Sequence, residues 1–332
     1  MKTDLNLSSR PRRNRKNAPI RSMLAETHLS HEHLVYPVFF EAGDRNQETP
    51  IKTLPGISRF SESSLLQEIE NCLKLNIQSF ALFPKIDDSL KNSMASEALN
   101  ENGLVPRMIK KIKQTFPEAI LFSDIALDPF SSDGHDGLVR GNEILNDETV
   151  QILAEMSVVH AASGVDYVSP SDMMDGRIGF IRESLEETGY KNTGIMAYSA
   201  KYCSSFYGPF REALDSAPRG GDKKTYQMDF RNIKEALTEV ALDIEEGADI
   251  VMVKPGLPYL DVIQIIHQNF TTPVAAYNVS GEYAMIKFAA QAGALNEAQA
   301  IHETLTSFRR AGASAIFTYF AKQWALNQIK SL

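Results

Sequence analysis

Short apolar runs alternate with longer segments of helical spacing from residue 34 onward. Eight runs rich in Val, Ile, Phe and Tyr can be counted, at residues 34–40, 79–84, 119–127, 165–170, 193–199, 249–255, 273–279 and 314–320. Near-continuous apolar runs of this kind favour strands that are buried on both faces. The segments between them, such as 61–76, 147–164 and 296–312, begin on Ser, Asp or Asn, and several end on Gly, as helices do.

Eight strand and helix units predict a closed (β/α)8 TIM barrel rather than an open doubly wound sheet. A dinucleotide-binding GxGxxG motif does not follow the first run. We therefore expect one catalytic domain over residues 31–332. Because a barrel of this type carries its chemistry at the C-terminal ends of its strands, reactive side chains should lie at the last residue of a run or just beyond it.

Residues 1–30 differ from the rest and predict an N-terminal arm. Their basic residues lie among Ser, Asn and Pro, without a clear helical or strand period: Arg10, Arg12, Arg13, Arg15 and Lys16. Such an arm could wrap a neighbouring subunit, bind nucleic acid or remain a solvated end. The formal net charge of the chain, −8, disfavours the nucleic-acid interpretation.

Composition narrows the function class further. The chain has 332 residues, of which 43% are hydrophobic and 23% charged, as in a globular enzyme. Its acidity argues against binding to nucleic acid or to an anionic membrane, which favours a small substrate. Cys72 and Cys203 are the only cysteines, too few for a disulfide framework or a Cys-rich zinc site. With no apolar stretch approaching 18 residues and no secretory signal, we expect a cytoplasmic protein.

Two lysines stand where barrel chemistry is expected. Lys254 ends the apolar run DIVMVKPG, and Lys201 follows the preceding run in TGIMAYSAK. Either could be a lysine that extends from a strand end into solvent, but two on neighbouring strands favour Schiff-base chemistry. A lysine at its usual pKa of about 10.4 is almost wholly protonated at neutral pH. Two ammonium groups about 6 Å apart would repel by roughly 3 kcal/mol, which lowers the pKa by about 2 units.

Residues 202–230 form a polar segment rich in Gly and Pro, longer than an ordinary loop, and we expect a lid over the barrel mouth. Within it, Arg211, Lys223 and Gln227 could hold a carboxylate. The alternative is that these residues are simply solvated.

An acidic loop follows the third run. Five polar residues concentrate within 13 positions: Asp124, Asp128, Asp133, His135 and Asp136. Oxygen ligands of this kind suit magnesium or calcium better than zinc. An acidic loop without metal is the alternative, because such loops are common at protein surfaces.

Several of these segments together resemble the 5-aminolevulinate dehydratase (porphobilinogen synthase) family. The matching motifs are LVYPVF, GHDG, VSPSDMMDGR, MAYSAKY with SSFYGPFR, MVKPG, YNVSGEYAM and IFTYFA, which extend over nearly the whole chain. The resemblance implies the barrel already expected from the pattern. It also implies a lyase of tetrapyrrole biosynthesis that condenses two molecules of 5-aminolevulinate to porphobilinogen with loss of two waters.

By this resemblance each substrate is held as an imine on one lysine, the first on Lys254 and the second on Lys201. Ser280 and Tyr319 match contacts to the first carboxylate, and the lid residues Arg211, Lys223 and Gln227 match contacts to the second. Lys223 stands where many members have Arg, so it cannot make a planar two-pronged bond. Other residues match pocket-lining positions: Asp124, Ser171, Tyr207 and Tyr277. A class I aldolase with a single Schiff-base lysine is the alternative enzyme.

The resemblance also bears on metals and assembly. Zinc-dependent members have three cysteines where this chain has Ala126, Asp128 and Asp136. The chain thus resembles the branch that lacks the catalytic zinc, although an ion at Asp128 and Asp136 stays open. Glu239 matches a glutamate that holds an allosteric Mg²⁺ near a subunit interface. A homo-octamer assembled through the arm is implied as well.

Overall fold

The computed structural model describes residues 7–43, 46–214 and 219–331. Eight parallel strands form a closed barrel: β1 (Leu34–Glu41), β4 (Ser79–Lys85), β5 (Ile120–Ile125), β8 (Tyr167–Pro170), β9 (Gly194–Lys201), β10 (Ile250–Lys254), β11 (Val274–Asn278) and β12 (Ala315–Thr318). Pairing of β12 with β1 closes the ring. The (β/α)8 fold predicted from the sequence is therefore confirmed.

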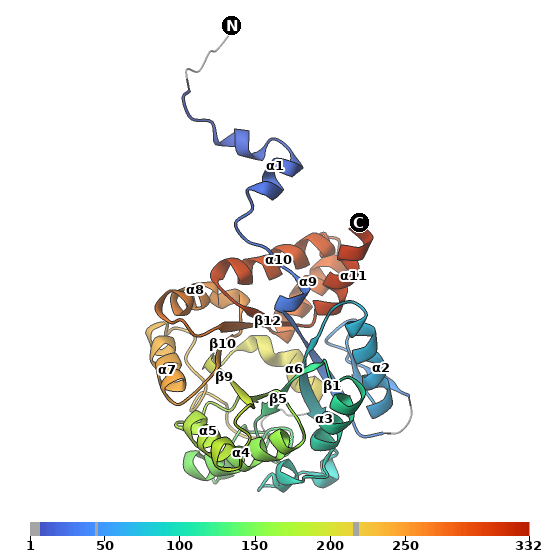
Figure 1. Cartoon of the computed structure of the whole chain (residues 1–332). Coiled ribbons are helices and arrows are strands. Elements are labelled where there is room, and N and C mark those ends of the chain that lie inside the picture. Colours follow the sequence, from blue (N-terminus) through green and yellow to red (C-terminus); the bar gives the residue numbers. More distant parts are fainter. Residues whose placement is uncertain (1–6, 44–45, 215–218, 332) are drawn as a thin grey trace.

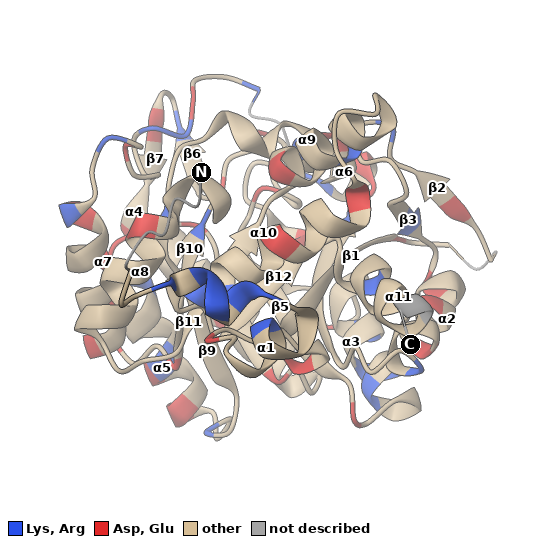
Figure 2. Ribbon diagram, turned by 90° about the horizontal axis from the view of Figure 1, so that it is seen from above, with Lys and Arg blue, Asp and Glu red and all other residues tan. Residues whose placement is uncertain are grey.

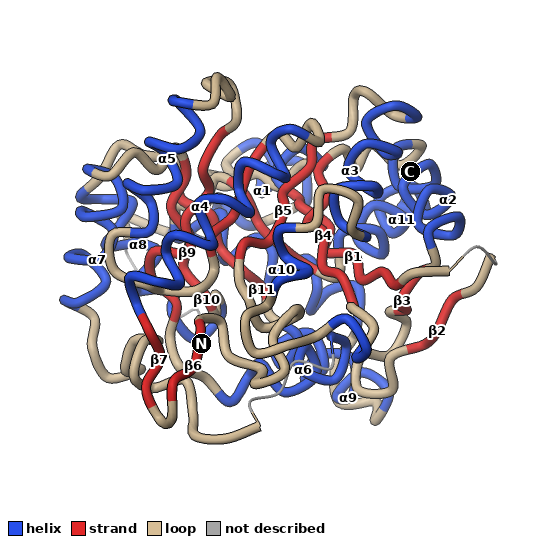
Figure 3. Tube along the Cα trace, turned by 90° about the horizontal axis from the view of Figure 1, so that it is seen from below, coloured by secondary structure: helices blue, strands red, loops and turns tan. Residues whose placement is uncertain are grey.

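Helices surround the barrel because their apolar faces cover the outward side chains of the strands (Figures 1 and 3). The longer ones are α2 (Glu62–Leu73), α3 (Leu104–Thr115), α4 (Asn146–Ala162), α5 (Arg177–Glu187), α7 (Lys234–Glu245), α8 (Leu260–Asn269), α9 (Ser280–Gln291), α10 (Glu297–Ala311) and α11 (Ala321–Ser331). Asn296 caps α10 by accepting the Gln299 N–H, and the helix ends at Gly312 with φ of 111°.

Short elements extend the barrel at the mouth. β3 (Ser58–Phe60) pairs with the end of β1, and β2 (Glu48–Pro50) pairs antiparallel with β3. A separate hairpin is made by β6 (Leu138–Arg140) and β7 (Glu143–Leu145). The segment that follows β9 contains helix α6 (Gly208–Leu214), whose end is held by a hydrogen bond from Arg59 to the Ala213 carbonyl.

The described part of the arm extends away from the barrel (Figure 1). It contains a 3-10 helix, Pro11–Arg15, and helix α1 (Ala18–Met23), and neither buries a residue. Figure 2 shows the Lys and Arg residues of this part of the chain in blue. The sequence pattern did not predict them, because Asn17 and Pro19 start a helix through a local cap rather than through an apolar face.

Candidate active site

Lys201 and Lys254 end adjacent strands and are paired in register at the barrel mouth. The pairing depends on a one-residue bulge. Val251 pairs with Ala197, but Val253 pairs with Ala200, so β9 contains one residue more than β10 over this stretch. At the earlier offset, Lys254 would lie opposite Ala200, and Lys201 would point to the other face of the sheet. The bulge therefore brings both amines to the same face.

Lys254 is enclosed by aromatic rings. Its side chain is buried, with 6% of the residue exposed. The Nζ atom lies 4.7 to 5.3 Å from four ring centroids, those of Tyr198, Tyr207, Phe210 and Tyr277. Among the described residues no hydrogen bond or ion pair reaches this amine. Burial, and then the charge of Lys201, lower the pKa of Lys254 to about 7. Burial is thus the larger of the two causes, ahead of the repulsion between the lysines.

Lys201 has polar partners instead. Its Nζ donates to the carbonyl of Ser171 and lies 3.4 Å from Oδ2 of Asp136. The ring of Tyr198 lies close to both amines: its centroid is 5.9 Å from Nζ of Lys201 and 4.9 Å from Nζ of Lys254. The two amines of the site therefore differ in their surroundings although they are neighbours in the sheet.

Asp136 accepts hydrogen bonds from three side chains. Besides Lys201 it accepts from Nζ of Lys223 at 2.8 Å and from Nε2 of Gln227 at 3.5 Å. Burial acts to raise the pKa of Asp136, but Lys201 and Lys223 outweigh it and hold that pKa well below its usual range. Lys223 also lies 3.7 Å from Asp128, and the two carboxylates keep its pKa raised despite burial. An internal ammonium therefore lies between Asp128 and Asp136.

Asp124, near the end of β5, is the second unusual carboxyl of the site. Burial, and then the nearby charge of Asp128, raise its pKa to about 7. Its Oδ1 atom is buried without a hydrogen bond in the described structure. A carboxyl with this pKa can both take up and release a proton at neutral pH.

A small cavity of about 30 Å³ brings most of the expected residues together. It is lined by Asp124, Asp128, Asp136, Ser171, Lys201, Tyr207, Phe210, Arg211, Lys223, Gln227 and Lys254. This space suits about one water molecule. Since α6 contributes Phe210 and Arg211 to the lining, a larger ligand requires this helix or its neighbours to move.

Ser280, Tyr277 and Tyr319 lie beside this cavity rather than in its lining. The hydroxyls of Tyr277 and Tyr319 are 3.3 Å apart. Ser280 Oγ accepts the N–H of Phe210 and donates to the carbonyl of Phe206. Ser280 thus fastens the start of α9 to the segment over the mouth, and Tyr277 faces Lys254 with its ring.

Comparison with known proteins identifies the family of the chain. The sequence model of the family "Delta-aminolevulinic acid dehydratase" matches residues 8–327. The chain belongs to this family. It is 52% identical to the chloroplastic enzyme of Glycine max over 97% of this chain and 78% of that protein, and 52% identical to the chloroplastic enzyme 1 of Arabidopsis thaliana over 97% and 75%.

A solved structure of a family member is also very similar. It is the dehydratase (porphobilinogen synthase) of Toxoplasma gondii ME49 in complex with the reaction product porphobilinogen. The TM-score is 0.96 at 50% identity, over 99% of this chain and 94% of that chain. The activity and the fold expected from the sequence are thus both supported.

One expectation is contradicted. The relatives in Glycine max, Physcomitrium patens, Arabidopsis thaliana and Oryza sativa are all named chloroplastic, so the expected cytoplasmic location is wrong. The scarcity of cysteine argued against an oxidising compartment, but it does not distinguish one reducing compartment from another. As for membranes, the described helices include none that is long and apolar enough to cross a bilayer.

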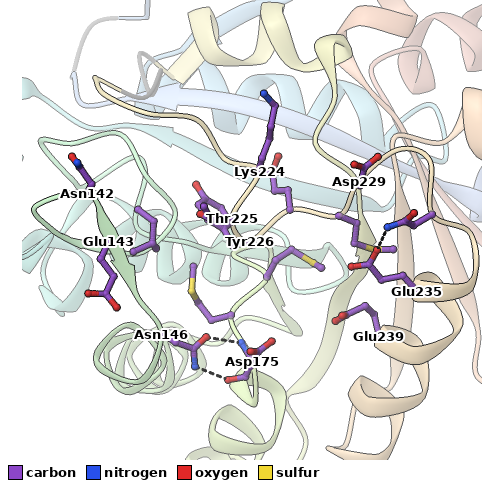
Figure 4. Close-up of a pocket in the computed structure, with 16 residues that line it drawn as sticks. Asn142, Glu143, Asn146, Asp175, Lys224, Thr225, Tyr226, Asp229, Glu235 and Glu239 are labelled. Carbon is purple, nitrogen blue, oxygen red and sulfur yellow. Dashed lines mark hydrogen bonds between the residues drawn. The ribbon is translucent and has the colours of Figure 1, made fainter.

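Glu239, the residue that the dehydratase family suggests for magnesium, lies outside the barrel mouth. It lines a separate cavity of about 660 Å³ together with Asp175, Glu235 and Asn146 (Figure 4). Asn146 bonds both the carbonyl and the N–H of Asp175. Burial is the main cause that raises the pKa of Glu239, and Asp243, Asp175 and Glu235 add to it against Arg177. The cavity therefore offers oxygen donors and excess negative charge.

Several residues of the site were not predicted. Tyr198 and Phe210 complete the rings around Lys254. Glu282 is fully buried and accepts the N–H groups of Gly256 and Leu257, which fixes the turn after Lys254. A carboxylate in the first turn of a helix could have drawn attention to Glu282. His135 was noted only as part of the acidic loop, but both of its ring nitrogens have partners in segment 219–227.

Proposed function

We propose that the chain makes porphobilinogen through Schiff bases on Lys254 and Lys201. Family membership gives the overall activity: the chain is a lyase of tetrapyrrole biosynthesis that converts 5-aminolevulinate to porphobilinogen. The observation that carries the two-lysine proposal is the register pair Lys201–Lys254, buried at the mouth in contrasting surroundings. A class I aldolase with one lysine has no use for the second buried amine.

Lys254 is suited to react first. With a pKa of about 7, a large fraction of its side chains is neutral at neutral pH, and only the neutral amine adds to a ketone. Addition to the ketone of the first 5-aminolevulinate gives a carbinolamine, which loses water to form the imine. Asp124 can transfer a proton in this step because its own pKa is about 7.

Lys201 would hold the second substrate in the same way. Arg211, Lys223 and Gln227 line the same cavity and present donors for its carboxylate. Ser280 and Tyr319 would receive the first carboxylate once the Ser280 hydroxyl exchanges its bond to the Phe206 carbonyl for the substrate. Imine formation acidifies the neighbouring carbon and so permits the bonds between the two substrates, with two waters lost overall.

Borohydride trapping tests this assignment. With 5-aminolevulinate present, borohydride should reduce the imine and leave substrate mass on the peptide that contains Lys254, and on that of Lys201 in a fraction of the molecules. Peptide mass spectrometry reads both, and exposed Lys191 serves as the internal control. Porphobilinogen formation with no adduct at Lys254 contradicts the proposal.

No catalytic zinc is expected in this chain. Ala126, Asp128 and Asp136 provide no thiolate, and Lys223 already forms ion pairs with both aspartates. Within the described residues there is also no group of three or more His, Cys, Asp or Glu placed to hold a metal. Whether Asp128 and Asp136 bind another ion during turnover stays a prediction that the ammonium of Lys223 disfavours.

Glu239 would instead hold a hydrated Mg²⁺. The ion keeps most of its waters and needs only one or two carboxylates, which the cavity of Glu239, Glu235 and Asp175 supplies. Bound there, Mg²⁺ would neutralise the acidic cavity without contacting substrate. The arm, which exposes Met23 and Leu24, would cover these apolar side chains against another subunit of a homo-octamer.

Light scattering with and without Mg²⁺ tests metal and assembly together. In chelated protein, Mg²⁺ should restore larger mass and turnover in parallel, and Glu239→Ala should abolish the response while trapping at Lys254 persists. Deletion of residues 1–25 should reduce the mass even with Mg²⁺ present. Unchanged mass in both variants contradicts these assignments.

A further inference from the structure

The acidic loop after β5 is bonded to the segment that carries Lys223 and Gln227. The carbonyl of Asp133 accepts the N–H of Arg219 at 3.0 Å. His135 Nε2 lies 2.8 Å from the carbonyl of Gly220, and His135 Nδ1 lies 3.2 Å from the hydroxyl of Tyr226. One imidazole therefore reaches the polypeptide at two points that are six residues apart.

The hydrogen-bond partners define the tautomer of this imidazole. A carbonyl oxygen can only accept, so Nε2 of His135 carries the proton and donates to Gly220. In the neutral ring Nδ1 is the acceptor, and the hydroxyl of Tyr226 donates to it. The same hydroxyl oxygen accepts the backbone N–H of Asp136 at 3.4 Å. The ring edges of His135 and Tyr226 also meet, with centroids 6.1 Å apart.

Lys223 lies midway between the two points that His135 holds. Lys223 and Gln227 are buried, and both bond to Asp136, the residue that follows His135. The backbone N–H of Gln227 donates to the carbonyl of Lys223, which makes the turn compact. Lateral movement of this turn is therefore restrained from its two ends by a single side chain.

We propose that His135 is a positioning residue for the second substrate, holding the 220–226 turn so that Lys223 and Gln227 face Lys201. The proposal rests on the two-lysine function above. Its donors and acceptors are all protein groups, so His135 does not touch substrate. On the Lys254 side, Ser280 joins α9 to α6 through hydrogen bonds that do not involve this turn.

The probe is 4-oxopentanoate, which has the ketone and carboxylate of the substrate but no amine, so imines form without condensation. Borohydride trapping is measured against probe concentration on the peptides of Lys201 and Lys254. In His135→Ala the half-saturating concentration at Lys201 should rise about tenfold, the effect of one buried hydrogen bond, while that at Lys254 stays within about twofold. His135→Gln, which keeps an N–H donor for Gly220, should recover part of the loss.

Tyr226→Phe removes the hydroxyl that bonds Nδ1 of His135. Its effect and that of His135→Ala should be less than additive in the double variant, because both break the same bond. His160→Ala is the matched control, since His160 is a buried histidine that bonds Ser123 on a different part of the barrel. It should lower thermal stability without a selective change at Lys201.

The proposal is wrong if the half-saturating concentration rises equally at both lysines. It is also wrong if that concentration is unchanged at Lys201 in both His135 variants and in Tyr226→Phe. Either result leaves the two-lysine function standing. If the wild-type protein forms no adduct at Lys201 with 4-oxopentanoate and borohydride, the two-lysine function is wrong, and so is the positioning role of His135. The conservative variants keep the test decisive if His135→Ala does not fold.

Discussion

Lys254 and Lys201 are the same residue type at the same height of neighbouring strands, yet their surroundings are opposite. Four aromatic rings enclose Lys254, whereas Lys201 contacts a carboxylate and a carbonyl. An apolar enclosure disfavours the charged amine, and a carboxylate favours it. Under the proposed function, the neighbours of two identical side chains would set the order in which two identical substrates are bound.

The strongest way to break this comparison is to remove each amine. Lys254→Ala and Lys201→Ala should each lower porphobilinogen formation by at least about 10⁴-fold, because each removes a covalent partner. A colour assay for the pyrrole measures the loss, with Lys191→Ala as an exposed control. If the amines act in order, Lys201→Ala should still be trapped at Lys254. A variant that retains most of its rate would show that its lysine has a structural role only.

Stability should change in opposite directions when each lysine becomes an apolar residue of similar length. Lys254→Met should raise the free energy of unfolding by about 1–3 kcal/mol, since a partnerless buried amine is removed. Lys201→Met should lower it by about 2 kcal/mol, because Asp136 loses one of its cations. Urea unfolding measures both changes.

The stabilising effect of Lys254→Met should depend on pH, because the pKa of Lys254 differs between the folded and the unfolded chain. The pKa of Lys254 is about 7 in the folded chain and about 10.4 when unfolded, so the unfolded state binds more protons between these values. The wild-type chain therefore gains stability from this group as pH rises from 7 to 10, and the advantage of Lys254→Met should shrink over that range. The same advantage at pH 6 and pH 10 would contradict the assigned pKa.

A smaller change sharpens the comparison. Phe210→Ala should admit water beside Lys254 and raise its pKa, so that the pH midpoint of trapping moves up from about 7 by about one unit. At pH 6 the trapping rate should then be about tenfold lower than in the wild type. Tyr277→Phe keeps a ring at the same place and should leave the midpoint unchanged. Equal midpoints in all three proteins would show that the rings do not set the pKa.

Much of the barrel could be predicted from the sequence, since eight apolar runs with helical segments between them have few other solutions. The position of Lys201 and Lys254 at the ends of adjacent strands was predicted too, because strand ends are where a barrel exposes reactive groups. Glu239 was not accessible to this reasoning: an acidic residue on a helix is ordinarily solvated, and only the family resemblance singled it out.

Other parts depend on contacts that no local pattern encodes. Lys201 shares a face with Lys254 only because β9 departs from simple alternation, and Phe210 contacts Lys254 only because α6 folds back over the mouth. Lys223 was expected either to bind a carboxylate of the substrate or to be solvated, whereas it is buried against Asp128 and Asp136, which lie 95 and 87 residues earlier in the chain. Residues 215–218 of that expected lid lie outside the described residues.

Because of the bulge in β9, the face to which Lys201 points depends on the number of residues in this strand. Ala197 pairs with Val251, and Lys201 pairs with Lys254. Three residues separate Ala197 from Lys201 in β9, but only two separate Val251 from Lys254 in β10. A substitution at Ala200 changes one side chain, but removal of that residue would invert the facing of Lys201 while the apolar composition of the strand hardly changes. The proposed two-amine chemistry would thus tolerate most replacements in this strand but not the deletion of one residue.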